Sequence, residues 1–379
     1  MPMEVKNKKI LFFSRDPGAA NCVIPVYERI TNKYRIDADL LGKDFALNKY
    51  TEANLKYEDI NKLIYPIDID SVKKFLKDNK YTLVVTGVES TDFTNILLWR
   101  AANELGIKSI AIIDGWINYA SRFTFDELGE YKENSPKFFP TFICTIDEYA
   151  KKEMLSEGLP EEKIIITGQP YFETVKEHIA SIDEKKQIET RTRLFLKESE
   201  HVITFVSEPI TESYSDPFYF GYTEFTILEQ VIEALKDTVL DSSHNYILVI
   251  RLHPRNNKEL FGRFVKNINF PKNLRTIIED KLSSQELVAI SDIVVGMSSM
   301  FLVETAIAGK LYSSVQIGLK TKDPFVLSRL GISKTILSYD DLVILFQNYI
   351  KKGIAVNSPK FSVIPNASSQ IVELIEKIL

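Results

Sequence analysis

The sequence predicts an α/β protein with two domains, each built around a parallel sheet. Short apolar runs alternate with segments of helical periodicity along most of the chain, a pattern typical of βαβ units. The chain has 379 residues, of which 45% are apolar, so both domains can bury a core of ordinary size. A charged stretch at 181–200, without glycine or proline, separates two such series, and we interpret it as a connecting helix.

The first domain, 1–180, is expected to contain five strands rich in β-branched and aromatic residues. Helices are expected where apolar residues recur every three or four positions, with Asp70 as an N-cap and Gly106 and Gly158 as stops. The expected strands are 9–14, 83–87, 109–113, 141–146 and 163–168, and the expected helices are 24–31, 71–77, 94–105, 148–157 and 172–180.

The second domain, 201–365, repeats the alternation, and the last helix, 366–379, is expected to return to the first domain. Two similar halves joined in this way imply a cleft between them, which is a preferred place for a ligand. The expected strands are 201–207, 246–252, 274–278, 293–296 and 312–316, and the expected helices are 225–237, 284–290, 300–308, 340–351 and 368–379.

Composition excludes several classes of protein. The formal net charge is -5, so no broadly basic surface exists to hold nucleic acid. Cys22 and Cys144 lie far apart among apolar residues, which favours buried thiols in a reducing compartment over a disulfide or metal site. The N-terminus lacks the apolar core of a signal peptide, and no apolar run approaches the ~20 residues of a membrane span. We therefore expect a cytoplasmic protein; peripheral contact with the inner face of a membrane and the oligomeric state stay open.

A His-Pro pair ends the apolar run in YILVIRLHPR. Proline ends a strand because it cannot donate to the ladder, so the His253 side chain is expected at the strand tip, where open parallel sheets bind ligands. Imidazole can bond a phosphate oxygen, protonation would add charge, and Arg251 and Arg255 can add bidentate hydrogen bonds. A surface turn with a hydrogen-bonded histidine is the alternative.

A second candidate phosphate site lies where the run 293–296 passes through Met-Ser-Ser into a helix. Helix N-termini present unpaired N–H groups that suit a phosphate, and the hydroxyls of Ser298 and Ser299 add donors. Simple N-capping would use the same two residues.

Three further residues are assigned to the nucleotide. Glu304, one turn into that helix, can reach a ribose hydroxyl or remain on an exposed face. Ser207 and Glu208 end the first strand of the second domain. The long loop that follows them, to about 222, is rich in Tyr, Phe, Ser and Asp, and we expect it to close over the donor.

In the first domain, an apolar strand delivers Asp114 at its end, followed by a glycine. A carboxylate at a strand tip can act as a general base on an acceptor hydroxyl; an Asx-turn is the alternative, and Glu89 is the second candidate for the base. Aromatic faces suit sugars, so we assign Trp116, Tyr119 and Arg122 of the same loop to the acceptor side. Plain packing would also explain them.

The loop after the first strand, RDPGAAN, is not a dinucleotide fingerprint, because it lacks the GxGxxG spacing. Asp16, Gly18 and Asn21 of this loop are assigned to the acceptor side or to a tight turn.

Pairs of aspartates that suit a divalent ion occur at 37/39 and 68/70. The second pair precedes a helix and is typical of a capping turn, so we expect no required metal.

At these residues the chain resembles the GT-B glycosyltransferase superfamily, whose members have two Rossmann-like domains facing across a cleft. Within it, bacterial sialyltransferases and related CMP-sugar transferases carry an acidic-Gly motif, then HP and Ser motifs, which Asp114, His253 and Ser298-Ser299 match in order. The resemblance implies that Asp114 is the base and that His253 and the serines hold the CMP phosphate. Ile113 stands where that family usually has a further acidic residue. The HPR and serine motifs also resemble CDP-glycerol glycerophosphotransferases, and UDP-N-acetylglucosamine 2-epimerases share the architecture.

These resemblances favour a metal-independent glycosyltransferase without a cofactor. It would move a sugar by direct displacement from a nucleotide donor, CMP-linked by preference with UDP and CDP open, to a hydroxyl of a bacterial surface glycan or lipid-linked acceptor. Domain 1–180 would bind the acceptor and domain 201–365 the donor. The alternatives are a hydrolysing nucleotide-sugar 2-epimerase, a CDP-glycerol-type glycerophosphotransferase and a non-catalytic nucleotide-sugar-binding subunit.

Overall fold

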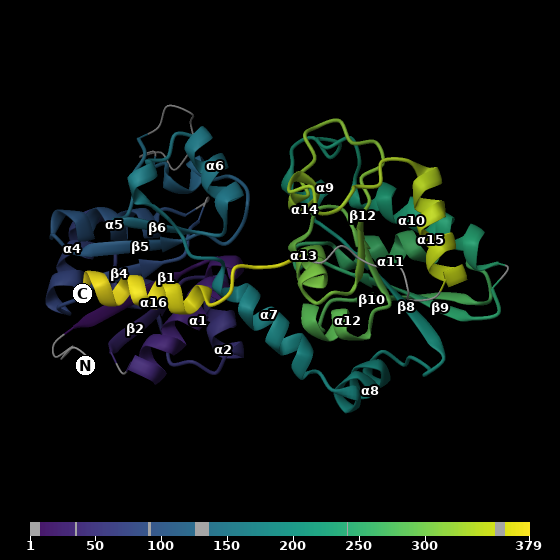
Figure 1. Cartoon of the computed structure of the whole chain (residues 1–379), viewed down its shortest axis with the longest axis horizontal. Coiled ribbons are helices and arrows are strands. Elements are labelled where there is room, and N and C mark those ends of the chain that lie inside the picture. The colour runs from purple at the N-terminus through teal and green to yellow at the C-terminus, as the bar shows by residue number, and fades with distance from the viewer. Residues whose placement is uncertain (1–7, 35, 90–91, 126–135, 241, 353–360) are drawn as a thin grey trace. The chain divides into compact units, whose positions relative to one another are not determined.

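The computed structural model describes residues 8–34, 36–89, 92–125, 136–240, 242–352 and 361–379. The chain forms two compact units, drawn in Figure 1. Unit 1 contains residues 1–174 together with 363–379, and unit 2 contains residues 175–362. Among the described residues, no helix is long and apolar enough to cross a bilayer.

Unit 1 is built on a parallel sheet of seven strands in the order β3-β2-β1-β4-β5-β6-β7. The strands are β1 (Lys9–Ser14), β2 (Asp37–Gly42), β3 (Glu58–Asp59), β4 (Leu83–Thr86), β5 (Lys108–Ile112), β6 (Phe142–Thr145) and β7 (Ile164–Ile166). The helices are α1 (Pro17–Glu28), η1 (Arg29–Tyr34), α2 (Phe45–Glu52), α3 (Ile60–Leu63), α4 (Ile69–Asp78), α5 (Thr94–Glu104), η2 (Ala120–Phe123), α6 (Glu148–Ser156), η3 (Glu161–Lys163) and α16 (Ala367–Ile378). Helix α7 (Pro170–Ser181) begins in unit 1 and continues into unit 2.

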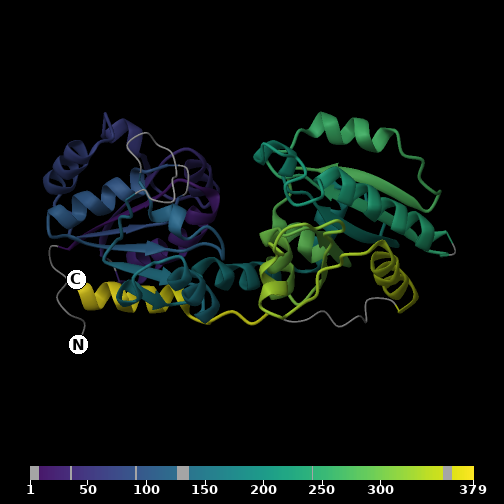
Figure 2. The same cartoon turned by 90° about the horizontal axis from the view of Figure 1, so that it is seen from above.

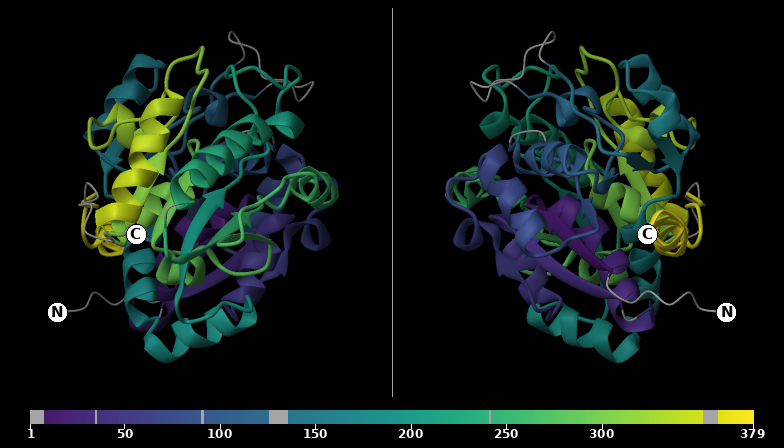
Figure 3. Two further views of the ribbon diagram at one scale, coloured as in Figure 1. Left: turned by 90° about the vertical axis from the view of Figure 1, so that its right-hand side faces the viewer. Right: turned by 90° about the vertical axis from the view of Figure 1, so that its left-hand side faces the viewer.

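The strands of this sheet are apolar on both faces because helices cover both faces. Alternate residues of β1 enter different cores: Phe12 packs with α1 and α16, whereas Phe13 packs with α4 and α5. The C-terminal helix α16 buries Ile371 and Ile375 beside α1, and the yellow helix lies against N-terminal elements in Figures 1 and 2. Figure 3 shows the strands of unit 1 with helices on either side.

Unit 2 repeats the plan with a parallel sheet of five strands in the order β10-β9-β8-β11-β12. Its core on one face joins alternate residues of β8 and β9 to α10 and α15. The strands are β8 (Glu200–Val206), β9 (Asn245–Arg251), β10 (Leu274–Glu279), β11 (Ile293–Gly296) and β12 (Leu311–Ser314). The helices are α8 (Glu184–Arg193), α9 (Ile210–Ser213), α10 (Glu224–Val239), α11 (Lys258–Lys266), α12 (Ser284–Ile290), α13 (Met300–Ile307), α14 (Val326–Arg329) and α15 (Tyr339–Lys352).

Several elements differ from the sequence-based expectation. The stretch at 181–200 is not one helix: α7 ends at Ser181, and α8 starts after Asp183, whose side chain caps it by accepting from the Lys186 N–H at 2.8 Å. Helix α1 starts at Pro17, seven residues before the expected position, because proline suits the first turn of a helix. Strand β2 and helices α2 and α11 were not expected at all.

Candidate functional site

Both sheets have a topological switch point, between β1 and β4 in unit 1 and between β8 and β11 in unit 2. Open α/β sheets bind ligands outside the carboxyl ends of the strands at such points. The residues that follow these four strands are therefore the first to consider in each unit. They include Arg15, Asp16 and Glu89 in unit 1, and Ser207, Glu208, Ser298 and Ser299 in unit 2.

His253 lies two residues beyond β9 and is partly buried. Its Nδ1 accepts a hydrogen bond from the Arg255 N–H at 3.1 Å, so the ring proton belongs on Nε2. Burial, with the nearby Arg255 and Arg251 cations, lowers the pKa of His253 to about 4. At neutral pH His253 is thus a neutral Nε2–H donor, and not the charged group that the sequence allowed.

Unsatisfied donors lie near the same strand ends. Arg251 Nη1, Asn256 Nδ2 and Ser207 Oγ are buried without a hydrogen-bond partner among the described residues. Buried polar groups nearly always have partners, so each of these three atoms calls for one. Burial also lowers the pKa of Arg251, and Arg255 is exposed. An anionic ligand at this edge would supply acceptors that the chain itself does not.

The turn before α13 holds an anion from the chain itself. The Glu208 carboxylate accepts from the Ser298 N–H at 2.5 Å and from Ser298 Oγ at 2.8 Å. Ser299 caps α13, its hydroxyl accepting from the Phe301 N–H at 3.2 Å. Glu304 is buried and accepts from Ser284 Oγ at 2.5 Å. Two residues assigned to the nucleotide, Glu208 and Ser298, therefore bond each other. The side chain of a third, Glu304, is bonded to Ser284 at the start of α12.

Asp114 follows β5 and Ile113, and its carboxylate is held by two contacts. Arg122 Nη1 donates to Oδ1, and both side chains are mostly buried, with 18% of Asp114 and 12% of Arg122 exposed. On the other side Oδ2 lies against the backbone of Gly18, where a Cβ atom would be only 2.2 Å away. A glycine is therefore needed at position 18 to leave room for the Asp114 carboxylate. Asn21, also assigned to the acceptor side, is a partly buried residue of α1.

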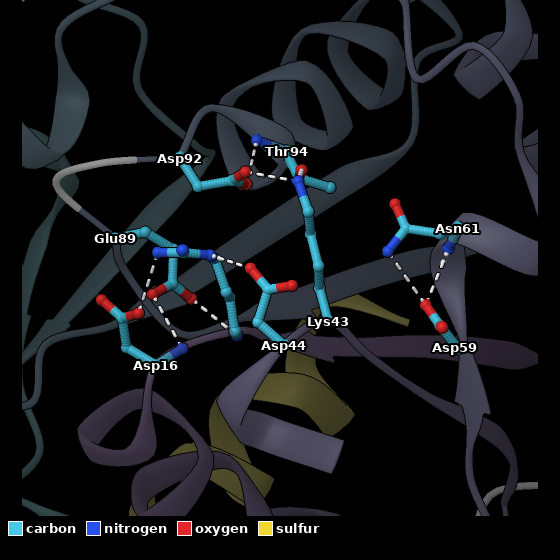
Figure 4. Close-up of polar contacts among 9 residues, drawn as sticks. Asp16, Lys43, Asp44, Asp59, Asn61, Glu89, Asp92 and Thr94 are labelled. Carbon is cyan, nitrogen blue, oxygen red and sulfur yellow. Dashed lines mark hydrogen bonds and ion pairs between the residues drawn. The ribbon is translucent and has the colours of Figure 1, made fainter. Parts of the chain in front are cut away.

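Glu89 lies three residues after β4, and its carboxylate accepts hydrogen bonds from the backbone of the β1–α1 turn (Figure 4). Its two oxygens accept from the Arg15 N–H at 2.9 Å and the Asp16 N–H at 3.2 Å. Burial, together with the charges of Asp16 and Asp114, raises the pKa of Glu89 to about 8. Burial also raises the pKa of Asp16. Glu89 is the more buried of these two carboxyl groups, and with a pKa of about 8 it is protonated at neutral pH.

Two salt bridges beside Glu89 escaped the sequence reasoning. Lys43 Nζ contacts Asp92 Oδ2 at 2.5 Å, and Arg15 Nε contacts Asp44 Oδ2 at 2.7 Å (Figure 4). Lys43 and Asp44 directly follow β2, the strand that was not expected. The alternation in DADLLG was the available signal, because it places Leu40 in one core and Leu41 in the other.

The aromatic residues of the Asp114 loop are buried. Trp116 stacks on Phe172 at 5.5 Å and donates its indole N–H to Asp147 Oδ2 at 2.8 Å. Tyr119 is fully buried. Their faces are therefore occupied by protein, so they support the loop and offer no stacking surface for a sugar in this structure.

The aspartate pairs considered for a metal have structural contacts. Asp39 lies in β2 and forms a salt bridge with Lys9 at 2.7 Å. Asp68 caps α4 by accepting from the Ser71 N–H at 2.8 Å, and Asp70 pairs with Lys73 at 3.1 Å. In the described part of the chain, no group of three or more His, Cys, Asp or Glu residues is arranged to hold a metal.

Comparison with known proteins identifies the fold. No family model and no curated protein matches the sequence. The UDP-GlcNAc 2-epimerase of Neisseria meningitidis bound to UDP-GlcNAc is similar, with a TM-score of 0.66, 16% identity and coverage of 97% of this chain and 100% of that one. The UDP-GlcNAc 2-epimerase of Methanocaldococcus jannaschii has a TM-score of 0.67 and 15% identity, with coverage of 97% of this chain and 99% of that one. A glycosyltransferase from Rickettsia africae has a TM-score of 0.58 and 13% identity, with coverage of 98% of this chain and 99% of that one.

These likenesses confirm the predicted GT-B fold. Parallel sheets of seven and five strands, each with helices around it, match epimerase and glycosyltransferase structures over nearly the whole chain. At 13–16% identity the match establishes the architecture only. Chemistry can differ widely on one fold, so it has to be argued from the residues at the strand ends.

Proposed function

We propose that unit 2 binds the nucleotide of an activated sugar. Unit 1 then supplies the acid–base groups for transfer of the sugar to a hydroxyl. The observation that carries the proposal is the set of donors at the end of β9: the neutral His253 Nε2–H, the exposed Arg255 and the unsatisfied Arg251 Nη1. Such donors suit a phosphate. We retain CMP as the preferred nucleotide, with UDP and CDP as alternatives, and a glycan or lipid-linked glycan in the cytoplasm as the acceptor.

In this proposal Asp114 is the general base. Its Oδ2 takes the proton of the acceptor hydroxyl while that oxygen forms a bond to the anomeric carbon of the donor sugar. The bond between this carbon and the phosphate oxygen breaks, and its electron pair leaves with the phosphate. His253 and Arg255 offset the charge on the departing phosphate. Arg122 orients Asp114, because its guanidinium contacts the other carboxylate oxygen.

Nucleotide binding is the first test. Thermal unfolding with CMP, CDP, UDP, GDP and ADP should rank the donors, since a ligand at 100 times its Kd adds about 2.7 kcal/mol of stability. His253→Ala should weaken binding of the best nucleotide by about 1.5–3 kcal/mol if the bond to a charged phosphate is lost. Unchanged affinity in this variant, or no stabilisation of the wild type by any of the five, would contradict the donor site.

Turnover is the second test. Asp114→Asn keeps the shape of the turn but removes the proton acceptor, so transfer should fall by about 10²–10⁴-fold. Nucleotide binding, measured on the same preparation, should survive. Near-normal transfer would reassign the base to Glu89 or to no residue.

One observation favours a second function, epimerisation of a nucleotide sugar. That reaction needs one group to remove a proton and another to return one, and Glu89, protonated at neutral pH, lies near the charge of Asp114. Incubating UDP-GlcNAc without acceptor in D₂O tests this directly. An epimerase would produce the 2-epimer with deuterium at C2, and a transferase would not. A chain that binds nucleotide but is inactive in both assays would be a binding subunit.

A further inference from the structure

The turn between β11 and α13, here called the α13 turn, is the part of unit 2 best suited to a phosphate. The Glu208 carboxylate already occupies it. Its Ser298 N–H and hydroxyl both donate to the Glu208 carboxylate. A helix N-terminus attracts negative charge through its unpaired N–H groups and its dipole. A carboxylate is the anion in a protein that most resembles a phosphate, so Glu208 takes the place that the donor phosphate would need.

From this pairing we infer that Glu208 is a built-in competitor of the donor: its carboxylate must leave the α13 turn before a nucleotide phosphate can bind there. The inference rests on the proposed donor site and adds to it a residue that controls its affinity for nucleotide. Glu208 comes two residues after β8, and Ser298 comes two residues after β11. The two strands are neighbours in the sheet, and this adjacency brings the Glu208 side chain to the turn before α13.

The surroundings of Glu208 favour such an exchange. Burial raises the pKa of Glu208 although the backbone and hydroxyl of Ser298 donate to it, so the ionised carboxylate is held at a cost in solvation. A phosphate at the same turn would keep the hydrogen bonds of Ser298.

The expected effect on affinity follows from populations. If the turn is open in only a fraction of molecules, the apparent Kd for nucleotide is the intrinsic Kd divided by that fraction. Glu208→Gln keeps the size of the side chain and removes its charge, so the open fraction rises. An open fraction of roughly one tenth in the wild type would give roughly tenfold tighter binding in the variant.

A matched control is present in the same unit. Glu286 also places a carboxylate on a serine at a helix N-terminus: from within α12, its Oε2 accepts from the N–H and hydroxyl of the N-cap Ser283, both at 3.0 Å. It has not been assigned to the donor. Glu286→Gln therefore removes a carboxylate from a helix N-terminus without opening the proposed phosphate site.

The experiment is a titration of full-length wild type, Glu208→Gln, Glu208→Asp and Glu286→Gln with CMP and with UDP by calorimetry. Glu208→Asp keeps the charge but is one methylene shorter, so it cannot span both Ser298 donors as well as the native side chain does. Both Glu208 variants should bind nucleotide more tightly than the wild type, and Glu286→Gln should match the wild type.

Two other outcomes have separate meanings. Nucleotide affinity that is unchanged or lower in both Glu208 variants, with the wild type binding normally, would overturn the inference and make Glu208 a ligand contact or a bystander. Failure of every protein to bind either nucleotide would overturn the proposed donor site, and this inference with it.

Discussion

A glycine determines where the Asp114 carboxylate lies. Because a Cβ atom on Gly18 would be 2.2 Å from Oδ2, Gly18→Ala must displace either Asp114 or the start of α1. We expect a loss of turnover close to that of Asp114→Asn, with nucleotide binding retained because unit 2 is unchanged. Gly115→Ala is the control, since nothing lies within 4 Å of its Cβ position. Steady-state rates and nucleotide affinity of both variants check this, and equal rates would exclude a positioning role.

The proton on Glu89 makes stability depend on pH. Its pKa rises from 4.5 to about 8 on folding, so between these values the folded protein holds a proton that the unfolded chain releases. Stability should therefore fall as pH rises through this window, by up to about 1.4 kcal/mol per pH unit. Glu89→Gln should show a shallower slope, with a remainder from Asp16, whose pKa is also raised. Urea unfolding at intervals from pH 5 to 9 measures both slopes; identical slopes would refute the assignment.

At the scale of elements, α16 completes the core of unit 1 although it comes from the far end of the chain. Its residues Ile371, Val372 and Ile375 are fully buried with α1 and β1. The Ser368 hydroxyl also donates to Glu173 at 2.7 Å, which ties the start of the helix to α7. Unit 1 therefore depends on a segment that follows unit 2 in sequence.

Ile371→Ala should destabilise unit 1 by about 2–5 kcal/mol, because it leaves a cavity beside α1 that the sheet cannot fill. Glu373→Ala, on the exposed side of the same helix, should change little. The free energy of unfolding in urea measures both. Comparable stability of the two variants would show that α16 packs more loosely than its burial indicates.

At the scale of the whole molecule, no group of three or more His, Cys, Asp or Glu side chains among the described residues is arranged to hold a metal. Asp39, Asp68 and Asp70 each have a cation or a helix N-terminus as partner. We therefore expect transfer to proceed in EDTA at the rate seen without it. Loss of turnover in EDTA, restored by Mg²⁺ or Mn²⁺, would show that a bound donor recruits a metal to this site.

Local sequence patterns predicted most of the strands and helices, because the periodicity of each element appears in residues that are close in sequence. His253, Ser298 and Asp114 were recognised because each follows an apolar run and so belongs at a strand end. Strand β2 was missed because its apolar run is short and two of its first three residues, Asp37 and Asp39, are charged. Lys43 and Asp44 were missed for the same reason, because they directly follow this strand.

The sequence by itself determined the α/β class, the two parallel-sheet domains and the strand ends that carry the polar residues. Only the tertiary structure decided which of these residues meet. Glu208 and Ser298 lie 90 residues apart, and they meet because β8 and β11 are neighbours in a sheet whose order is set by long-range packing. For the same reason Glu89 joins Asp16, and Trp116 turns inward to Asp147. The charge state of His253 also depended on the fold, because its pKa follows from burial and from the two arginines that the turn brings beside it.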